Sequence, residues 1–211
     1  MEEQILLGTL LGDAYIPKLI GRRKTYMIGW QHSKKQGEYA IWKAENSLSN
    51  YSVYERSRLD KRTGNIYHSI TCYSTKDDYK YYRELFYRDK KEVSQEVLNR
   101  LTELSIAVWF MDDGSLYYNG NNCHLTLSVD SFNEDSKKRI INFFKDKYGI
   151  QFKNHQKRIR TTSVKQAELW DKHFSKYYHP TMMYKTLKDS KERYNKTLSN
   201  EKKKYRNKKY K

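Results

Sequence analysis

Cysteine and proline are nearly absent from this 211-residue chain, which has two of each. Cys72 and Cys123 lie outside any Cys-x-x-Cys or Cys/His grouping, so the sequence indicates neither a disulfide framework nor a zinc site. No stretch approaches the roughly 20 apolar residues of a membrane helix, and the N-terminal "MEEQ" lacks the layout of a signal peptide. We therefore expect an intracellular protein with no membrane partner.

Acidic residues are also few relative to basic ones. The chain has 25 Asp and Glu against 42 Lys and Arg, a net charge of +17, which favours a polyanionic partner such as nucleic acid. An AT-rich coding sequence, which favours Lys, Asn, Ile and Tyr, is an alternative source of part of this excess. Hydrophobic residues make up 37%, and 20 residues are Tyr, which often lies at interfaces. The length suits one domain or two small fused ones.

The most informative feature is an internal repeat. The segments "ILLGTLLGDAYI" (5–16) and "SIAVWFMDDGSLY" (105–117) align Asp13 with Asp113, at an offset of 113 − 13 = 100 residues. Each is followed by an alternating apolar and polar stretch, "KTYMIGWQ" in the first half and "CHLTLSVD" in the second. Alternation of this kind predicts a strand with one buried face.

Further helices and strands follow in the same order in both halves. The helical patterns are "GEYAIWKAENSL" and "FNEDSKKRIINFFKDKYG", then "DDYKYYRELFY" and "QAELWDKHFSKYY"; the strands are "YERSRL", "NIYHSITCYS" and "FKNHQKRIRTTSVK". We predict an α+β fold with two pseudo-symmetric αββαββα halves, 1–92 and 93–187, whose antiparallel sheets have one face covered by helices. Residues 188–211 form a basic tail, either mobile or a marginal helix, that serves solubility or phosphate contact.

The two repeated segments predict a pair of helices that pack closely and end together. Gly8 and Gly12 lie four residues apart on one helix face, a spacing usually retained for close backbone approach, whereas the second copy has Val108 and Asp112 there. Asp13 and Asp113 would then converge and repel each other. A divalent cation resolves that conflict, and Mg²⁺ typically takes one or two carboxylates. The alternative is that these acids only terminate helices and form turns.

Both segments resemble the LAGLIDADG motif of homing endonucleases, with "LLGTLLGDA" as the first copy and "IAVWFMDDG" as the second. The resemblance covers roughly residues 5–187, includes "LSVDSF" and "HPTMMYK", and is to the single-chain branch with two motifs. It implies two sheets that form a DNA-binding saddle, with the motif helices packed at the centre. It also implies a site-specific endonuclease that hydrolyses one phosphodiester on each strand of a long target with Mg²⁺, for which Mn²⁺ can substitute.

The resemblance also implies roles for individual residues. Asp13 and Asp113 would bind the catalytic metals, whereas Asp112 occupies a variable motif position. A lysine is expected near each metal, namely Lys185 in "MMYK" and Lys91 in "RDKKEVS", where Lys90 is the alternative and Ser94 replaces the usual proline. Gln31 and Asp130, 18 and 17 residues after the motif acids, are expected at matching strand positions that order the water around the metals.

The polar faces of the predicted strands supply candidate DNA contacts, because two-stranded ribbons fit the major groove. An ordinary solvated strand residue is the alternative for each of them. The candidates are Arg56, Arg58, Tyr67, Ser69, Thr71 and Tyr73 in the first half, and Arg158, Arg160, Thr162 and Lys165 in the second.

A duplicated protein can present one cutting site to each strand of a duplex, so we expect a monomer that binds double-stranded DNA. The main alternative is a maturase that binds intron RNA through the same fold without cleavage, and a transcription factor is the third. Retention of both motif acids favours the nuclease, because an RNA binder needs no converging carboxylates. The lack of flanking protein-splicing sequence favours an intron-encoded or free-standing gene in an organelle such as the mitochondrion, a bacterium or a phage-infected cell.

Overall fold

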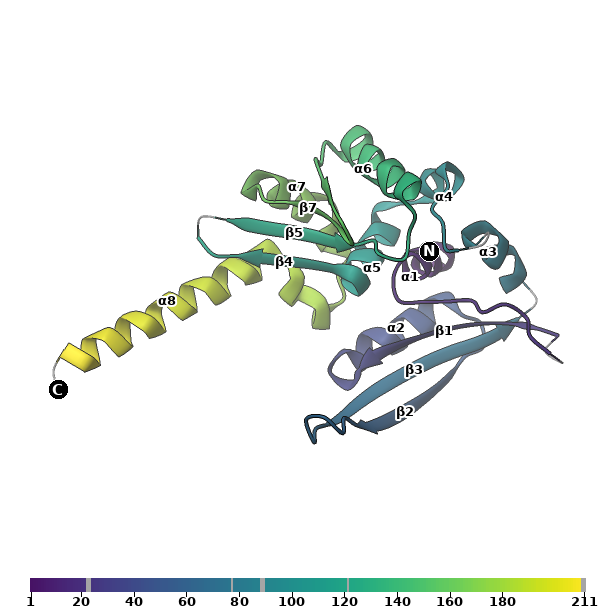
Figure 1. Cartoon of the computed structure of the whole chain (residues 1–211), viewed down its shortest axis with the longest axis horizontal. Coiled ribbons are helices and arrows are strands. Elements are labelled where there is room, and N and C mark those ends of the chain that lie inside the picture. The colour runs from purple at the N-terminus through teal and green to yellow at the C-terminus, as the bar shows by residue number, and fades with distance from the viewer. Residues whose placement is uncertain (22–23, 77, 88–89, 121, 210–211) are drawn as a thin grey trace.

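The computed structural model describes residues 1–21, 24–76, 78–87, 90–120 and 122–209. Two antiparallel sheets lie on either side of a central pair of helices, α1 (Glu2–Leu11) and α5 (Glu103–Asp113), as Figure 1 shows. One sheet has the strand order β1-β3-β2 and the other β4-β5-β7-β6. The predicted α+β fold with two related halves is therefore confirmed.

The first half contains β1 (Tyr26–Ser33), α2 (Gly37–Ser47), β2 (Ser52–Leu59), β3 (Ile66–Lys76) and α3 (Tyr79–Phe86), with the short 3₁₀ helix η1 (Lys34–Gln36) before α2. The strand expected directly after the first motif is reduced to one bridge, in which Tyr15 pairs with Gly29. Both backbone hydrogen bonds of that bridge form, at 3.1 and 3.2 Å. The described sheet of this half therefore has three strands, not four.

The second half keeps the full repeat. After α4 (Gln95–Arg100) and α5 come β4 (Gly114–Tyr118), β5 (Cys123–Ser128), α6 (Glu134–Tyr148), β6 (Lys153–His155), β7 (Arg158–Thr161) and α7 (Val164–Phe174). The segment 152–165, predicted as the second pair of strands of this half, holds two short strands and then the first turn of α7. The 3₁₀ helices η2 (Ser175–Tyr177) and η3 (Pro180–Lys185) lead from α7 to the C-terminal helix.

The central helices approach each other closely because α1 has glycine where they cross. A Cβ added at Gly8 would lie 2.7 Å from Cβ of Val108, and one added at Gly12 would lie 2.5 Å from Cβ of Asp112. Contacts that short would force the helices apart. The glycines of the first copy thus face the larger residues at the matching positions of the second copy, as the sequence predicted.

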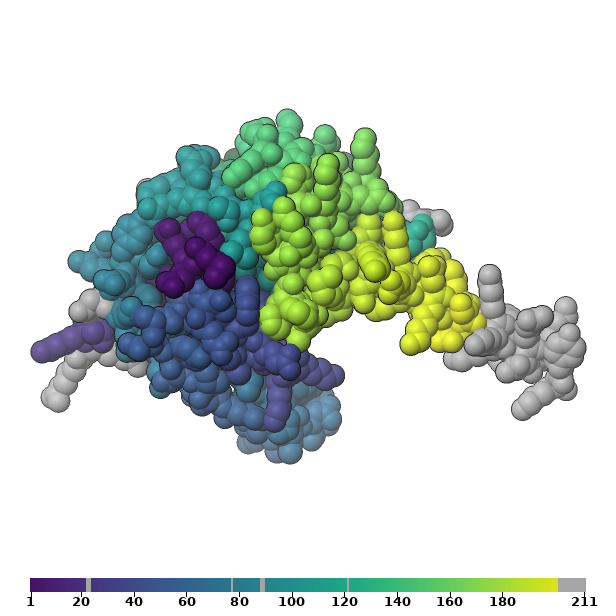
Figure 2. Space-filling view, turned by 180° about the vertical axis from the view of Figure 1, so that it is seen from behind, coloured from purple at the N-terminus to yellow at the C-terminus, as the bar shows by residue number. Residues whose placement is uncertain are grey.

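The core is built around this helix pair. Five apolar side chains of α1, from Ile5 to Leu11, and the run 106–111 of α5 are buried, together with the inward faces of both sheets. Figure 2 shows the start of α1 at the surface, bordered by segments of both halves.

Of the two alternatives for the C-terminal segment, a mobile tail or a marginal helix, the structure has the helix: Leu187–Lys209 forms α8, which projects from the second half in Figure 1. Asp171 accepts a hydrogen bond from the Leu187 amide at 2.8 Å and so caps the start of α8. Ser190 accepts a hydrogen bond from the Tyr118 amide, and Tyr194 packs on the Tyr118 ring. Within the described residues, no helix is long and apolar enough to cross a bilayer.

Candidate active site

Two motif carboxylates lie at the ends of the central helices, as predicted. Asp113 is the last residue of α5, and Asp13 follows α1 by two residues. Burial raises the pKa of Asp13 to about 6, with a further rise from Asp112, while Lys43 opposes it most strongly. Burial likewise raises the pKa of Asp113 to about 7, with further rises from Asp13 and Asp112. The carboxylates therefore repel each other in a partly buried site that a cation would stabilise.

Each motif helix ends against a lysine. Lys91 donates to the carbonyl oxygen of Gly12 at 3.1 Å, and Lys185 donates to the carbonyl oxygens of Phe110 and Asp112, both at 3.3 Å. Burial lowers the pKa of both lysines to about 8, and the nearby carboxylates oppose that shift. Cations at helix C-termini are stabilised by the helix dipole. The structure therefore brings Lys91 and Lys185 to equivalent places beside the two acids.

The segment 90–94 settles the register that the sequence left open. Lys90 is exposed, whereas Lys91 points at the end of α1. Ser94, which stands where the family usually has proline, accepts a hydrogen bond from the Val97 amide and caps α4. Of the two alternatives, Lys91 is thus the lysine placed beside the motif acids.

Protein groups occupy the carboxylate of Asp112, the acid at the variable motif position. Its side chain is fully buried, and the Lys43 ammonium lies 2.8 and 2.9 Å from its two oxygens. The Tyr39 hydroxyl donates to the same carboxylate at 2.8 Å, and the Asp13 amide donates to it at 3.3 Å. Asp112 therefore forms a buried ion pair that links α5 to α2.

Sequence reasoning missed Lys43, Tyr39 and His32. Tyr39 and Lys43 lie four residues apart, on the buried face of α2 with Ala40 and Ala44. A lysine within an apolar helix stripe was the available signal, because a buried ammonium requires a partner. His32 had no such signal, since it alternates with polar neighbours along β1.

His32 lies between the two acidic side chains on the first-half side. Its Nε2 is 3.5 Å from Oδ2 of Asp13 and 3.6 Å from Oδ1 of Asp112, and the side chain is 3% exposed. Burial, with the Lys43 charge next, lowers the pKa of His32 to about 4, so the ring is neutral near pH 7. Ligand atoms of these three residues lie within 4.8 Å of one another, but Lys43 already neutralises Asp112. A cation shared by all three is therefore disfavoured.

Gln31 and Asp130 do not occupy matching positions. Gln31 is an exposed residue of β1 whose amide donates to the Ser69 hydroxyl, whereas Asp130 lies in the turn after β5. The pairing of Ser115 with Thr126 beside Asp113 corresponds to the Tyr15–Gly29 bridge beside Asp13. Two residues further along, Gln31 corresponds to Ser128. The prediction for Asp130 as the counterpart of Gln31 was wrong, because the strand ends at Ser128.

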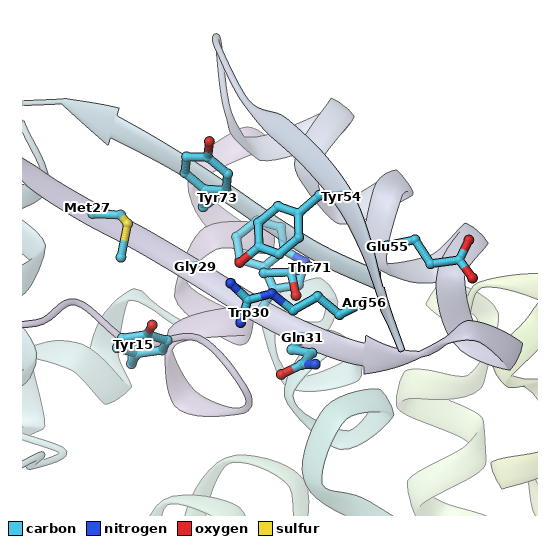
Figure 3. A pocket seen from close by; sticks show the side chains of 10 residues that line it. All are labelled: Tyr15, Met27, Gly29, Trp30, Gln31, Tyr54, Glu55, Arg56, Thr71 and Tyr73. Carbon is cyan, nitrogen blue, oxygen red and sulfur yellow. The ribbon is translucent and has the colours of Figure 1, made fainter. Parts of the chain in front are cut away.

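The six predicted contacts of the first half share one face of its sheet. Arg56 pairs with Ser69, Arg58 with Tyr67, and Gln31 with Thr71, so their side chains emerge on the same side. A hollow of about 650 Å³ lies on this face. In Figure 3 the Arg56 guanidinium lies among the side chains that line it, and Glu55 is directed away. The predicted residues Arg56, Thr71 and Tyr73 line it, together with Tyr15, Met27, Gly29, Trp30, Gln31, Tyr54 and Glu55.

The four predicted contacts of the second half divide into two groups. Arg158 and Arg160 alternate with buried Ile159 on β7, and exposed Thr162 follows that strand. Lys165 is also exposed, but it lies on α7. Its prediction as a strand residue was wrong, because the chain turns into the helix after Ser163. Both sheets thus present arginine on the face opposite their apolar side chains.

Comparisons with known proteins identify the family of the chain. The model described as the LAGLIDADG DNA endonuclease family matches residues 3–168. A probable intron-encoded endonuclease 1 of Wickerhamomyces canadensis is 31% identical over 200 residues, which cover 89% of this chain and 84% of the relative. The RecA protein of Mycolicibacterium flavescens is 25% identical, and the match covers 87% of this chain but 46% of that protein.

Solved structures show the same arrangement. The homing endonuclease I-WcaI bound to its DNA recognition sequence is 26% identical with a TM-score of 0.75, and the match covers 88% of this chain and 85% of that one. The LAGLIDADG meganuclease I-CpaMI bound to uncleaved DNA shares the fold, with a TM-score of 0.60 at 10% identity over 95% and 93% of the two chains. This chain therefore belongs to the LAGLIDADG DNA endonuclease family.

Proposed function

We propose that this protein is a homing endonuclease that acts as a monomer and hydrolyses one phosphodiester on each strand of a long double-stranded DNA target. The observation that carries the proposal is the convergence of Asp13 and Asp113, each beside a buried lysine, at the ends of the two central helices. The relatives whose printed names describe endonucleases support it. No observation favours the maturase alternative.

Asp13 and Asp113 suit a divalent metal. Their raised pKa values arise from burial and mutual repulsion, so a bound dication would stabilise both ionised forms. Oxygen donors that leave space for water and phosphate favour Mg²⁺, and Mn²⁺ accepts the same ligands. When bound, the metal would supply Lewis-acid activation of water and charge stabilisation at the phosphate.

Lys91 and Lys185 complement the two acids. Hydrogen bonds to helix-end carbonyl oxygens hold their ammonium groups in place, so each positive charge stays near a phosphate bound at the adjacent acid. A fixed cation stabilises negative charge that develops during hydrolysis without reorganising at that moment. Gln31, held by Ser69, would orient water on the first-half side. For the second half we propose Ser128 in this position and no longer Asp130.

The polar sheet faces supply recognition. On each half, arginine side chains stand among Tyr, Thr and Ser side chains, a mixture that can reach both phosphates and base edges. We propose that residues 1–92 and 93–187 each contact one half of the target. This division matches the pseudo-symmetry of the duplex, in which two antiparallel backbones are related by a dyad.

The intron-encoded relative supports an intron-encoded gene, expressed in the compartment that holds its target DNA. The test is to incubate purified protein and Mg²⁺ with DNA spanning the insertion point of its own gene. We expect cleavage of both strands that EDTA abolishes. Asp113→Asn should abolish cutting and leave target binding largely intact. Tight binding of intron RNA together with no nicking of DNA would favour the maturase instead.

A further inference from the structure

A cluster of buried polar side chains packs beside Asp13, one of the two motif acids. It consists of His32 from β1, Tyr39 and Lys43 from α2, and Asp112 from α5. His32 is 5% exposed, and Tyr39 and Lys43 are fully buried. Lys43 and Tyr39 fix the Asp112 carboxylate through hydrogen bonds of 2.8 to 2.9 Å. The cluster therefore joins the two halves of the chain rigidly beside the motif acids.

The cluster contacts Asp13 at two points. Asp112 accepts a hydrogen bond from the backbone amide of Asp13, and the His32 ring faces the Asp13 carboxylate at 3.5 Å. His32 Nε2 is buried and has no hydrogen-bond partner. A buried ring nitrogen that faces two carboxylates is most stable when it carries a proton. Polar contacts that are too long for a hydrogen bond in a free enzyme commonly shorten when the substrate complex forms.

Among the residues that the structure describes, Asp113 has no such support. Counting from the equivalent pairs Tyr15–Gly29 and Ser115–Thr126, His32 corresponds to Val129, whose side chain cannot donate a hydrogen bond. Asp112 itself corresponds to Gly12 in the aligned motifs, and Gly12 has no side chain. The two acidic centres are therefore chemically unequal, although the fold around them is pseudo-symmetric.

We propose that His32 is a positioning residue for Asp13, donating its Nε2–H to that carboxylate in the DNA complex, and that it sets the rate of one of the two strand cuts. This inference rests on the proposed endonuclease function. Lys43 and Asp112 act through His32 and the Asp13 backbone, and they fix where both lie. His32 does not touch DNA, because it points to the opposite face of β1 from Gln31.

The test measures the two strand cuts separately, with each strand of a target duplex labelled in turn. His32→Phe removes the donor and keeps a ring, His32→Gln keeps an N–H donor, and Val129→Ala is the matched control in the other half. We expect His32→Phe to slow one strand by about 10- to 100-fold, as for residues that orient metal ligands, and the other by less than about twofold. His32→Gln should recover part of the lost rate, and Val129→Ala should keep the wild-type strand ratio.

A second measurement needs no cleavage. Ring-nitrogen NMR of the metal-free protein should show His32 in the Nε2–H form, and Asp13→Asn should shift that nitrogen. The Nδ1–H form would overturn the inference, as would equal slowing of both strands or an unchanged strand ratio in a His32→Phe protein that folds. Wild-type protein that cuts neither strand would overturn the proposed function and, with it, this inference. Wild-type protein that cuts both strands, with an unchanged strand ratio in His32→Phe, would overturn this inference alone.

Discussion

Replacing Lys43 by methionine tests the buried ion pair at the centre of the structure. Both side chains are fully buried, and the ammonium lies 2.8 Å from the Asp112 carboxylate. Removing one member of such a pair leaves an uncompensated buried charge, which typically costs about 3–5 kcal/mol of unfolding free energy. Asp112→Asn should cost a similar amount, because it leaves the Lys43 ammonium without a counter-charge.

The double variant Lys43→Met/Asp112→Asn leaves no buried charge at this position. Its cost should therefore be clearly smaller than the sum of the single costs, with a coupling free energy of at least about 2 kcal/mol in a double-mutant cycle. Urea unfolding followed by circular dichroism measures all four proteins. Lys34→Met is the control, since Lys34 pairs with Glu55 at the same 2.8 Å but on the surface, and it should have no measurable effect. Additive single costs, or single costs near that of the control, would refute this account.

Three further predictions follow from the described contacts. Without divalent metal, the free energy of unfolding should fall as pH rises from about 4 to about 7. The folded pKa values of Asp13 (about 6) and Asp113 (about 7) exceed the ordinary 3.8, so the folded state holds more protons than the unfolded state in that window. Asp113→Asn should flatten this pH dependence in thermal unfolding. Gly8→Ala should destabilise the fold by about 1–3 kcal/mol, because the new methyl group would meet Val108 and the Ser105 carbonyl oxygen; unchanged urea unfolding would contradict the close helix contact. Arg56→Ala should weaken target binding by about 1–3 kcal/mol in a titration without cleavage, since Arg56 lies in the hollow of the first sheet; a loss equal on random DNA would assign it to phosphate.

The sequence was sufficient to predict the duplication, the two sheets and the convergence of Asp13 and Asp113. These features depend on local signals, namely strand alternation, helix patterns and a motif repeated at a fixed offset. The lysines beside the acids were also predicted, although Lys91 could be separated from Lys90 only when its hydrogen bond to the end of α1 was seen.

The sequence did not predict the contacts that form only when distant elements pack. Lys43 and Asp112 are 69 residues apart, and they meet because α2 and α5 both pack against α1. Asp130 was matched with Gln31 by counting residues from Asp113 and Asp13. The count failed because the connection that leads to β5 is shorter than the one that leads to β1. Composition left residues 188–211 between a mobile tail and a marginal helix. The Asp171 cap and the contact with Tyr118 are long-range contacts that support the helix.

The central claim is that Asp13 and Asp113 together form a metal-dependent centre for DNA hydrolysis. The most direct test compares wild-type protein with Asp13→Asn and Asp113→Asn on DNA spanning the insertion point of the gene, with Mg²⁺, Mn²⁺ or EDTA. The account predicts double-strand cleavage by the wild type with either metal, none with EDTA, and binding without cleavage by both variants. Wild-type protein that binds this DNA but never nicks it with either metal, or variants that still cut at the wild-type rate, would contradict the account.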